Sequence, residues 1–419
     1  MRSKNLLELA TELLREVLKF EQPADVLVSG FFRQHRSLGP RERHALAETT
    51  YDVVRRLPSY RHLAQSGSGA LERRLAVIGW QGGVAALRAA LTPAEQQWQE
   101  QMAAADPSIL PANLRHNLPA WLADTLQAQL GDQFWPLVQA IDRGAPLDLR
   151  VNALKIKREA AAVQLLEHGI EATPTPYSPL GLRIVGKPAL QKLEIFRSGE
   201  VEVQDEGSQL LALLLDARRG EMVVDFCAGA GGKTLALGAA MRNTGRLYAF
   251  DVSGHRLAAL KPRLARSGLS NVHPVQIAHE RDERIKRLAG KIDRVLVDAP
   301  CSGLGTLRRN PDLKWRQSPQ TVHALRAQQT LILEGASHLL KPGGRLVYAT
   351  CSLLDEENQL VADQFSAAHS GEFKPLPVLE ALASARVENA ESLVDGKFLR
   401  LWPHRHGTDG FFAAAWERT

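Results

Sequence analysis

The sequence predicts an α/β protein in which a Rossmann-like, doubly wound sheet is preceded by a small α+β module and an all-helical N-terminal domain. Three observations support this fold class. From residue 206 onward, short apolar runs alternate with helix-like segments. Over residues 3–140, apolar residues recur at helical spacing. Between these regions, apolar and polar residues alternate as they do in half-buried strands.

Length and composition limit the possible classes of protein. The 419 residues exceed what one core needs, so we expect two or three domains. Three cysteines without C-x-x-C spacing argue against a disulfide framework or a cysteine zinc site, and we expect no metal. No apolar run has membrane-spanning length and the start lacks a signal peptide's apolar region, so we expect a cytoplasmic protein that does not contact membranes. A net charge of +6 permits a polyanionic partner.

The N-terminal region, residues 1–140, reads as helical. A helix is expected near residues 6–18, another over Pro40–Leu57, and further helices at about 75–91 and 111–144. Basic residues are dense in this region and have two readings, an ordinary solvated face or a surface that contacts phosphates. They are Arg33, His35, Arg36, Arg41, Arg43, His44, Arg55, Arg56 and Arg61.

Residues 145–205 form the predicted α+β module. Leu147–Val151 alternates like a strand, and residues 157–168 like a helix. Further strands are expected near residues 182–185 and 199–204.

The third predicted domain spans residues 206–419, and its alternating pattern is typical of a doubly wound sheet. The chain end, around residues 397–402 and 410–417, reads as a hairpin. The expected sheet strands are Met222–Phe226, Arg246–Asp251, His273–Ile277, Arg294–Asp298 and Gly344–Thr350.

A glycine-rich turn, Cys227-Ala-Gly-Ala-Gly-Gly-Lys-Thr234, follows the first of these strands. Such a turn lets the backbone approach a ligand closely. It is not a P-loop, because Cys227 stands where that motif needs glycine, and Thr234 breaks the dinucleotide pattern. Asp251 ends the next strand, where an acid can bind ribose hydroxyls or cap a helix. An adenosyl ligand without phosphates fits best, which points to S-adenosylmethionine.

Two thiols, Cys301 and Cys351, follow two of the predicted strands, and Asp298 lies beside the first thiol. The carboxyl ends of parallel strands form the edge at which such sheets bind ligands. We therefore expect thiol chemistry on a substrate held at that edge. A helix N-terminus or the sulfonium of the cofactor could lower a thiol pKa there. Cys227 is expected to be a small residue in its turn without a catalytic role.

The segments that carry the chemistry resemble the Nop/Sun family, S-adenosylmethionine-dependent RNA 5-methylcytosine methyltransferases with a class I methyltransferase sheet. Within it, the chain is most similar to the bacterial group that methylates a cytosine of 16S ribosomal RNA. The match runs through roughly residues 145–419, and Leu38–Leu57 resembles more weakly the NusB-like, RNA-binding helical domain of that group. The resemblance rests on Asp298-Ala-Pro-Cys-Ser-Gly303, Arg308-Arg-Asn-Pro-Asp-Leu-Lys-Trp315, Leu340-Lys-Pro-Gly-Gly344, Tyr348-Ala-Thr-Cys-Ser352 and Glu356-Glu-Asn358.

The resemblance implies three catalytic residues. Cys351 adds to carbon 6 of cytosine, Cys301 serves product release, and Asp298 bonds the ring nitrogen and amino group. It also implies an RRM-like module at 145–205 and an RNA partner, 16S rRNA or an assembling small subunit; we expect a monomer. The implied cofactor-binding residues are Cys227, Ala228, Gly229, Ala230, Gly231, Gly232, Lys233, Asp251, Arg256, His279 and Asp298.

Two departures from the family pattern stand out. Gly229 and Ala230 replace an Ala-Pro pair, which predicts a more flexible loop. His279 stands where the family has an aspartate that contacts adenine, so His279, Glu280 or Asp282 could take that contact. Two alternatives also stay open: a DNA cytosine methyltransferase in which Cys301 attacks, and an RNA-binding ribosome-assembly factor with an inactive methyltransferase fold.

Overall fold

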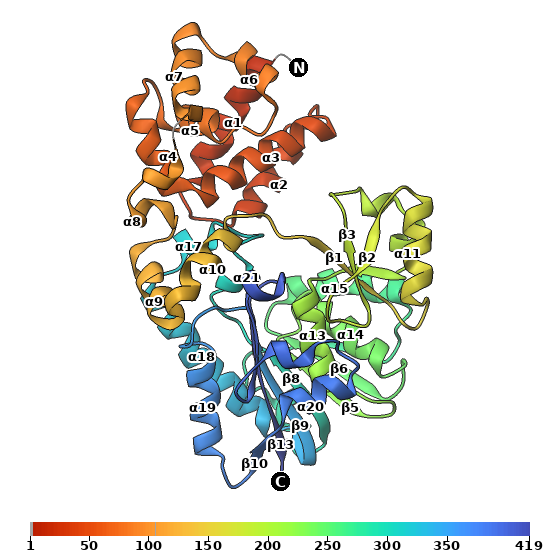
Figure 1. Cartoon of the computed structure of the whole chain (residues 1–419). Helices are drawn as coiled ribbons and strands as arrows, with labels where there is room; N and C mark the ends of the chain where they lie inside the picture. Colours follow the sequence, from red (N-terminus) through yellow and green to blue (C-terminus); the bar gives the residue numbers. More distant parts are fainter. Residues whose placement is uncertain (1–2, 105) are drawn as a thin grey trace. The chain divides into compact units, whose positions relative to one another are not determined.

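The computed structural model describes residues 3–104 and 106–419, and the chain folds into two compact units (Figure 1). The first unit comprises residues 1–144 and 306–319, and the second comprises 145–305 and 320–419. The division into domains at 1–140, 145–205 and 206–419 stays a prediction. None of the described helices is both long and apolar enough to span a membrane.

The first unit is helical, as its apolar spacing predicts. Leu7, Leu13 and Leu14 of the first helix are at most 1% exposed and lie in one apolar core. The helix expected over residues 40–57 begins at Pro40, where the Glu42 carboxylate accepts a hydrogen bond from the Gly39 N–H, and ends at Arg55. The helices are α1 (Ser3–Val17), α2 (Ala24–Gln34), α3 (Pro40–Arg55), α4 (Leu57–Leu63), α5 (Leu71–Ile78), α6 (Val84–Ala90), α7 (Pro93–Ala104), α8 (Ala112–Arg115), α9 (Ala120–Leu130), α10 (Phe134–Ile141) and α17 (Leu313–Arg316).

The segment 306–319 joins this helical core although it follows the first thiol by only a few residues. The indole N–H of Trp315 donates to the carbonyl of Val54 at 2.9 Å, and the ring packs against the apolar core. The buried ammonium of Lys314 donates to the carbonyl of Arg55 at 2.7 Å, and burial lowers its pKa to about 7. The helical unit therefore fixes a stretch that the sequence pattern places in the methyltransferase-like region.

The second unit contains a small antiparallel sheet in the strand order β2-β3-β1-β4. Leu149, Val151 and Leu182 from this sheet pack with Leu165 of the adjoining helix in one apolar core. The elements of this α+β module are β1 (Leu147–Val151), α11 (Arg158–Glu167), β2 (Ala172–Pro174), β3 (Gly181–Ile184), α12 (Glu194–Arg197) and β4 (Val201–Val203).

The large sheet of the second unit has nine strands, in the order β11-β12-β13-β9-β8-β5-β6-β7 with β10 beside β13. The five strands from β9 to β7 are parallel, which confirms the Rossmann-like class. The predicted terminal hairpin is also present, because β12 pairs antiparallel with β13. β13 then pairs antiparallel with β9, so the sheet is mixed. The strands are β5 (Met222–Phe226), β6 (Arg246–Asp251), β7 (Val272–Gln276), β8 (Ile292–Asp298), β9 (Leu340–Thr350), β10 (Phe373–Pro375), β11 (Val394–Asp395), β12 (Phe398–Leu401) and β13 (Phe411–Arg418).

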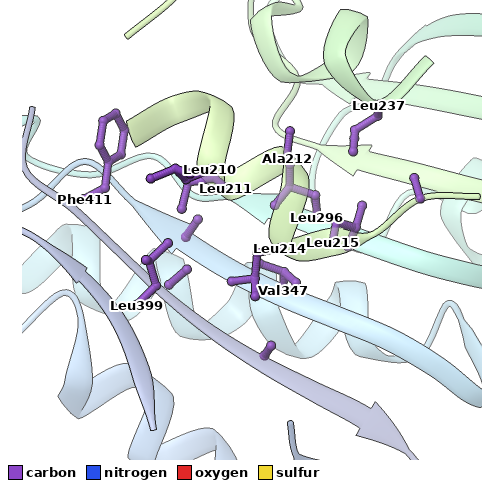
Figure 2. Packing of buried hydrophobic residues seen from close by; sticks show 14 of the residues in the cluster. Leu210, Leu211, Ala212, Leu214, Leu215, Leu237, Leu296, Val347, Leu399 and Phe411 are labelled. Atoms are coloured by element: carbon purple, nitrogen blue, oxygen red, sulfur yellow. The ribbon is translucent and has the colours of Figure 1, made fainter. Parts of the chain in front are cut away.

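Helices cover both faces of this sheet. Consecutive residues of a strand point to opposite faces, so a strand whose consecutive residues are all buried is covered on both sides. Val223 lies in the core on one face and Val224 in the core on the other. Figure 2 shows the first core, where Leu210 and Leu214 from one helix pack over Val347. The helices are α13 (Glu206–Leu215), α14 (Gly232–Ala240), α15 (Gly254–Ser267), α16 (Glu283–Lys286), α18 (Pro319–Ser337), α19 (Gln359–Ala368), α20 (Val378–Ser384) and α21 (Pro403–His406).

Candidate active site

The site is built at the carboxyl edge of the parallel strands. β5 lies between β6 and β8, and β9 is the next neighbour of β8. Four segments that are distant in sequence therefore end at the same edge: the glycine-rich turn after β5, Asp251 of β6, the Asp298–Cys301 stretch after β8, and Cys351 after β9. Ligands bind at this edge in open α/β sheets, where the strand order reverses.

The two thiols lie in contact at this edge. Strand register pairs Asp298 with Ala349, so Cys301 and Cys351 leave their strands side by side. Their Sγ atoms are 3.3 Å apart, and the backbone N–H of Cys351 donates to Cys301 Sγ at 3.3 Å. Hydrogen bonding to Cys351 and burial raise the pKa of the Cys301 thiol. Both cysteines, like Cys227, are free thiols. A pair of this kind can supply two sulfur atoms to one reacting ring.

An ion pair lies beside the thiols. The Lys233 ammonium, on the first turn of α14, donates to the Asp298 carboxylate at 2.7 Å. Burial lowers the pKa of Lys233, but the charges of Asp298 and Cys351 outweigh that effect and leave it raised. Lys233 therefore stays a cation within electrostatic reach of the Cys351 sulfur.

Glu357 joins the two thiol-bearing loops. It is fully buried, and its carboxylate accepts hydrogen bonds from the Ser302 N–H at 2.8 Å, the Ser302 hydroxyl at 2.5 Å, and the Ser352 hydroxyl. The Gln329 amide donates to the same carboxylate at 3.0 Å. Each serine directly follows one of the cysteines, so one carboxylate fixes the spacing between the loops. The sequence reading quoted Glu357 within a family motif and gave it no role.

The glycine-rich turn is tightly shaped. Gly229 has a φ of +57°. A Cβ atom at this position would have no neighbouring atom within 4 Å, so the turn is open there. Gly231 has a φ of +82°, and a Cβ atom there would meet the Leu260 side chain at 2.1 Å. Glycine is thus required at 231 by both backbone conformation and space. Cys227 has a φ of +73°, and burial raises the pKa of its thiol.

Asp251 supports the turn from β6. It is buried, and its carboxylate accepts hydrogen bonds from the N–H groups of Gly229 at 2.8 Å and Ser253 at 2.7 Å. Helix α15 is capped by Ser253, whose hydroxyl accepts from the Arg256 N–H at 3.3 Å. The alternative in which Asp251 caps that helix is therefore wrong.

Comparison with known proteins identifies the family. A profile described as 16S rRNA methyltransferase RsmB/F matches residues 212–417, and one described as a ferredoxin-like domain of RsmF/B-like methyltransferases matches residues 118–191. The "Probable ribosomal RNA small subunit methyltransferase B" of Synechocystis is 30% identical over 97% of this chain and 98% of that protein. The chain belongs to the RsmB/F family. The Nop/Sun resemblance is thereby confirmed.

Solved structures agree with this assignment. The crystal structure of PH0851 covers 100% of this chain and 99% of its own, with a TM-score of 0.79 and 26% sequence identity. The structure of NSun6 from Pyrococcus horikoshii with SFG covers 72% of this chain and 98% of its own, with a TM-score of 0.62 and 22% identity. The second likeness supports the fold alone.

In this RsmB/F chain, the remaining predicted cofactor residues lie on the outer part of the edge. Arg256 is exposed on the first turn of α15. His279 is exposed after β7, and its Nδ1 accepts a hydrogen bond from the Arg281 N–H at 3.1 Å. Asp282 caps α16, and its carboxylate accepts from the N–H groups of Ala278 and Arg284, each at 2.9 Å. Contacts of these residues with adenine stay predictions.

No group of three or more His, Cys, Asp or Glu side chains in the described part of the chain could hold a metal ion. The candidate site consists of thiols, one ion pair, and backbone groups of the glycine-rich turn.

Proposed function

We propose that this RsmB/F protein transfers a methyl group from S-adenosylmethionine to carbon 5 of a cytosine in small-subunit ribosomal RNA, through a covalent adduct between Cys351 and carbon 6. The observation that carries the proposal is the 3.3 Å approach of the Cys301 and Cys351 sulfur atoms beside the Lys233–Asp298 ion pair. Relatives named small subunit methyltransferases support ribosomal RNA as the substrate class.

The thiol is needed because carbon 5 of cytosine is a poor nucleophile. Cys351 adds to carbon 6 as a thiolate, and the electron pair of the 5,6 double bond moves to carbon 5, which becomes able to accept a methyl group. After transfer, a base removes the carbon 5 proton, the double bond re-forms, and Cys351 leaves as a thiolate. Lys233 lies within electrostatic reach of that thiolate before and after the reaction.

We expect Asp298 to bind the cytosine ring of the substrate. Asp298 is the last residue of β8 and its side chain is partly exposed, so one oxygen can bind the Lys233 ammonium while the other stays available to a substrate ring. A carboxyl in that position can bond the amino group and ring nitrogen 3, which stabilises charge in the adduct. Cys301, whose thiol pKa is raised, suits proton transfer or a later displacement better than the first attack.

The glycine-rich turn and Asp251 fit the cofactor. The turn is open at Gly229, and Asp251 presents a buried carboxylate that is already oriented by two backbone N–H groups. Such a carboxylate can accept both ribose hydroxyls of an adenosyl group. When bound, S-adenosylmethionine supplies an electrophilic methyl group.

The RNA surface assigned to the helical region is smaller than its basic residues suggest. Arg33, Arg36 and Arg41 are exposed and free to meet phosphates. Arg55 is buried and donates to the carbonyl of Arg308 at 2.9 Å, and Arg56 pairs with Asp52. Deleting residues 1–140 would also remove the core around Trp315, so substitutions of exposed arginines are the better test of RNA binding.

The decisive experiment measures transfer of a labelled methyl group to small-subunit rRNA and to duplex DNA, followed by digestion and identification of the modified base. We expect 5-methylcytosine in RNA and none after Cys351→Ala. Label in DNA alone would support the DNA alternative. Binding of RNA without any transfer by the wild-type protein would support an inactive assembly factor.

A further inference from the structure

Two arginines outside the glycine-rich turn donate hydrogen bonds to its carbonyl groups. Arg263 Nη1, from α15, donates to the Ala230 carbonyl at 2.6 Å. Arg150 Nη1, from β1 of the α+β module, donates to the Gly232 carbonyl at 2.8 Å. The turn residues on either side of Gly231 are thus held from two different parts of the second unit.

A buried glutamate of the module pairs with Arg263. Glu202 lies on β4 directly opposite Arg150 in the β1–β4 ladder. Its side chain is 5% exposed, and its carboxylate accepts from Arg263 Nη2 at 3.1 Å and from Arg266 Nε at 3.0 Å. A rigid module strand therefore orients the guanidinium of Arg263 toward the turn.

Arg150 is hard to explain as a contribution to stability. It is 4% exposed, its Nε has no hydrogen-bond partner within the described residues, and burial lowers its pKa to about 10. A buried cation with an unsatisfied donor destabilises a fold. Its Nη1 donates to the Gln204 side-chain oxygen and to the Gly232 carbonyl, and the second bond fixes the backbone one residue before Lys233.

The turn needs such restraint because it lacks proline. No residue of the turn from Cys227 to Thr234 is proline, and Gly229 has a φ of +57°. Glycine and alanine leave a loop more backbone freedom than proline does, and ordering it on binding costs free energy. Hydrogen bonds to the Ala230 and Gly232 carbonyls restrict that freedom before any ligand arrives.

We propose that Arg150 and Arg263 are positioning residues for the cofactor: through them the α+β module holds the glycine-rich turn in its binding conformation. The module would then complete the S-adenosylmethionine site in addition to any contact with RNA. This inference rests on the proposed function, since it assumes that the turn binds the cofactor.

The chain offers a matched control in Arg266. It shares the Glu202 carboxylate with Arg263 and packs its guanidinium 4.3 Å from the Phe196 ring centroid. No hydrogen bond from its side chain to the glycine-rich turn occurs among the described residues. Losing Arg266 therefore loosens the module without removing a contact to the turn.

The test compares Arg263→Ala with Arg266→Ala in the full chain, by hydrogen exchange of the turn amides without ligand and by calorimetric titration with S-adenosylmethionine. We expect Arg263→Ala to speed exchange in residues 228–232 and to weaken binding about 5- to 20-fold, because the turn must be ordered on binding. At saturating cofactor, kcat should stay near the wild-type value. Arg266→Ala should leave both the exchange and the affinity within about twofold.

A second variant separates positioning from folding. Arg150→Met removes the buried charge but keeps an apolar side chain of similar length, so the fold should be retained, which denaturant unfolding checks, while cofactor affinity falls about fivefold. Equal losses in the Arg263 and Arg266 variants, or unchanged exchange after Arg263→Ala, would overturn the proposal. A different result would be faster exchange in Arg263→Ala together with no cofactor binding by the wild-type protein. It would overturn the proposed function but still support the restraint of the turn by Arg263.

Discussion

The two ends of the ligand edge are built differently. At the thiol end, the loops after β8 and β9 are joined through buried Glu357, which accepts hydrogen bonds from Ser302, Ser352 and Gln329. At the outer end, the loop after β7 is stabilised by local bonds, such as those from Ala278 and Arg284 to Asp282. His279 on that loop is exposed.

The difference follows from what each end has to do. Attack by sulfur on a ring carbon requires placement within a fraction of an ångström, and a displacement of about 1 Å can cost roughly a hundredfold in rate. Contact with the edge of an adenine ring adds affinity and tolerates an exchange of donor and acceptor. The thiol end is therefore joined by a buried carboxylate, whereas His279 at the outer end is exposed.

Replacing the two thiols should have the largest effects on activity, and the two substitutions should block different steps of the reaction. Cys351→Ala removes the nucleophile, so activity should fall by at least about a thousandfold and no covalent complex should form. Cys301→Ala leaves attack possible and slows release. We therefore expect a protein–RNA adduct from the Cys301 variant that survives denaturing electrophoresis.

The adduct also separates the RNA mechanism from its DNA counterpart. An adduct seen only with Cys351→Ala would reverse the two assignments and make Cys301 the nucleophile. If both variants formed an adduct, neither thiol alone would be the required nucleophile, and the proposed order of steps would be wrong.

A smaller effect is expected where the thiol loops are joined. Glu357→Gln keeps the size of the side chain but loses one of its acceptors for Ser302 and Ser352, so the spacing of the sulfur atoms relaxes. We expect kcat to fall about 10- to 100-fold and the free energy of unfolding to drop by about 2 kcal/mol. Glu356→Gln is the control, because Glu356 is 36% exposed and its carboxylate pairs, among the residues that the structure describes, only with His323, at 3.4 Å. Equal losses in both variants would remove the special role of Glu357.

Asp225, on the central parallel strand β5, should make stability depend on pH. It is fully buried, and burial raises its pKa from 3.8 to about 7, although the Thr234 hydroxyl donates to it at 2.6 Å. The folded state then holds a proton that the unfolded state releases above about pH 4, so this group stabilises less as pH rises to 7. Asp225→Asn should stabilise the protein by about 2–4 kcal/mol at pH 8 and little at pH 4. Denaturant unfolding at the two pH values measures this; an equal change at both would contradict it.

Much of the second unit could be predicted because its signals are local. Met222–Phe226 and Arg246–Asp251 are strands with the predicted boundaries, since apolar runs bounded by turn residues specify parallel strands directly. The positions of Cys301 and Cys351 after two strands of one sheet could also be predicted, whereas their 3.3 Å approach depends on β8 and β9 being neighbours.

Other features depend on tertiary contacts that local periodicity does not encode. No pattern in the sequence around Trp315 predicts that this segment packs into the helical unit. Likewise, Arg150 and Arg263 look like ordinary strand and helix residues, and only the fold shows that both reach the carbonyls of one turn. The composition of the turn alone predicts a flexible loop. The arginines that donate hydrogen bonds to it lie far from it in sequence, so its composition does not reveal this restraint.

The smallest effect is expected at the outer end of the edge, at His279. Because its Nδ1 accepts from the Arg281 N–H, the ring proton sits on Nε2, which can donate to a ring nitrogen of adenine. His279→Ala should weaken S-adenosylmethionine binding about threefold, as expected for one solvent-exposed hydrogen bond, without changing Tm. Asp282→Ala should lower Tm through the lost helix cap and leave affinity within about twofold. Calorimetry and thermal unfolding on the two variants decide between them. A loss of affinity confined to Asp282→Ala would move the adenine contact to Asp282 and leave His279 as a surface residue.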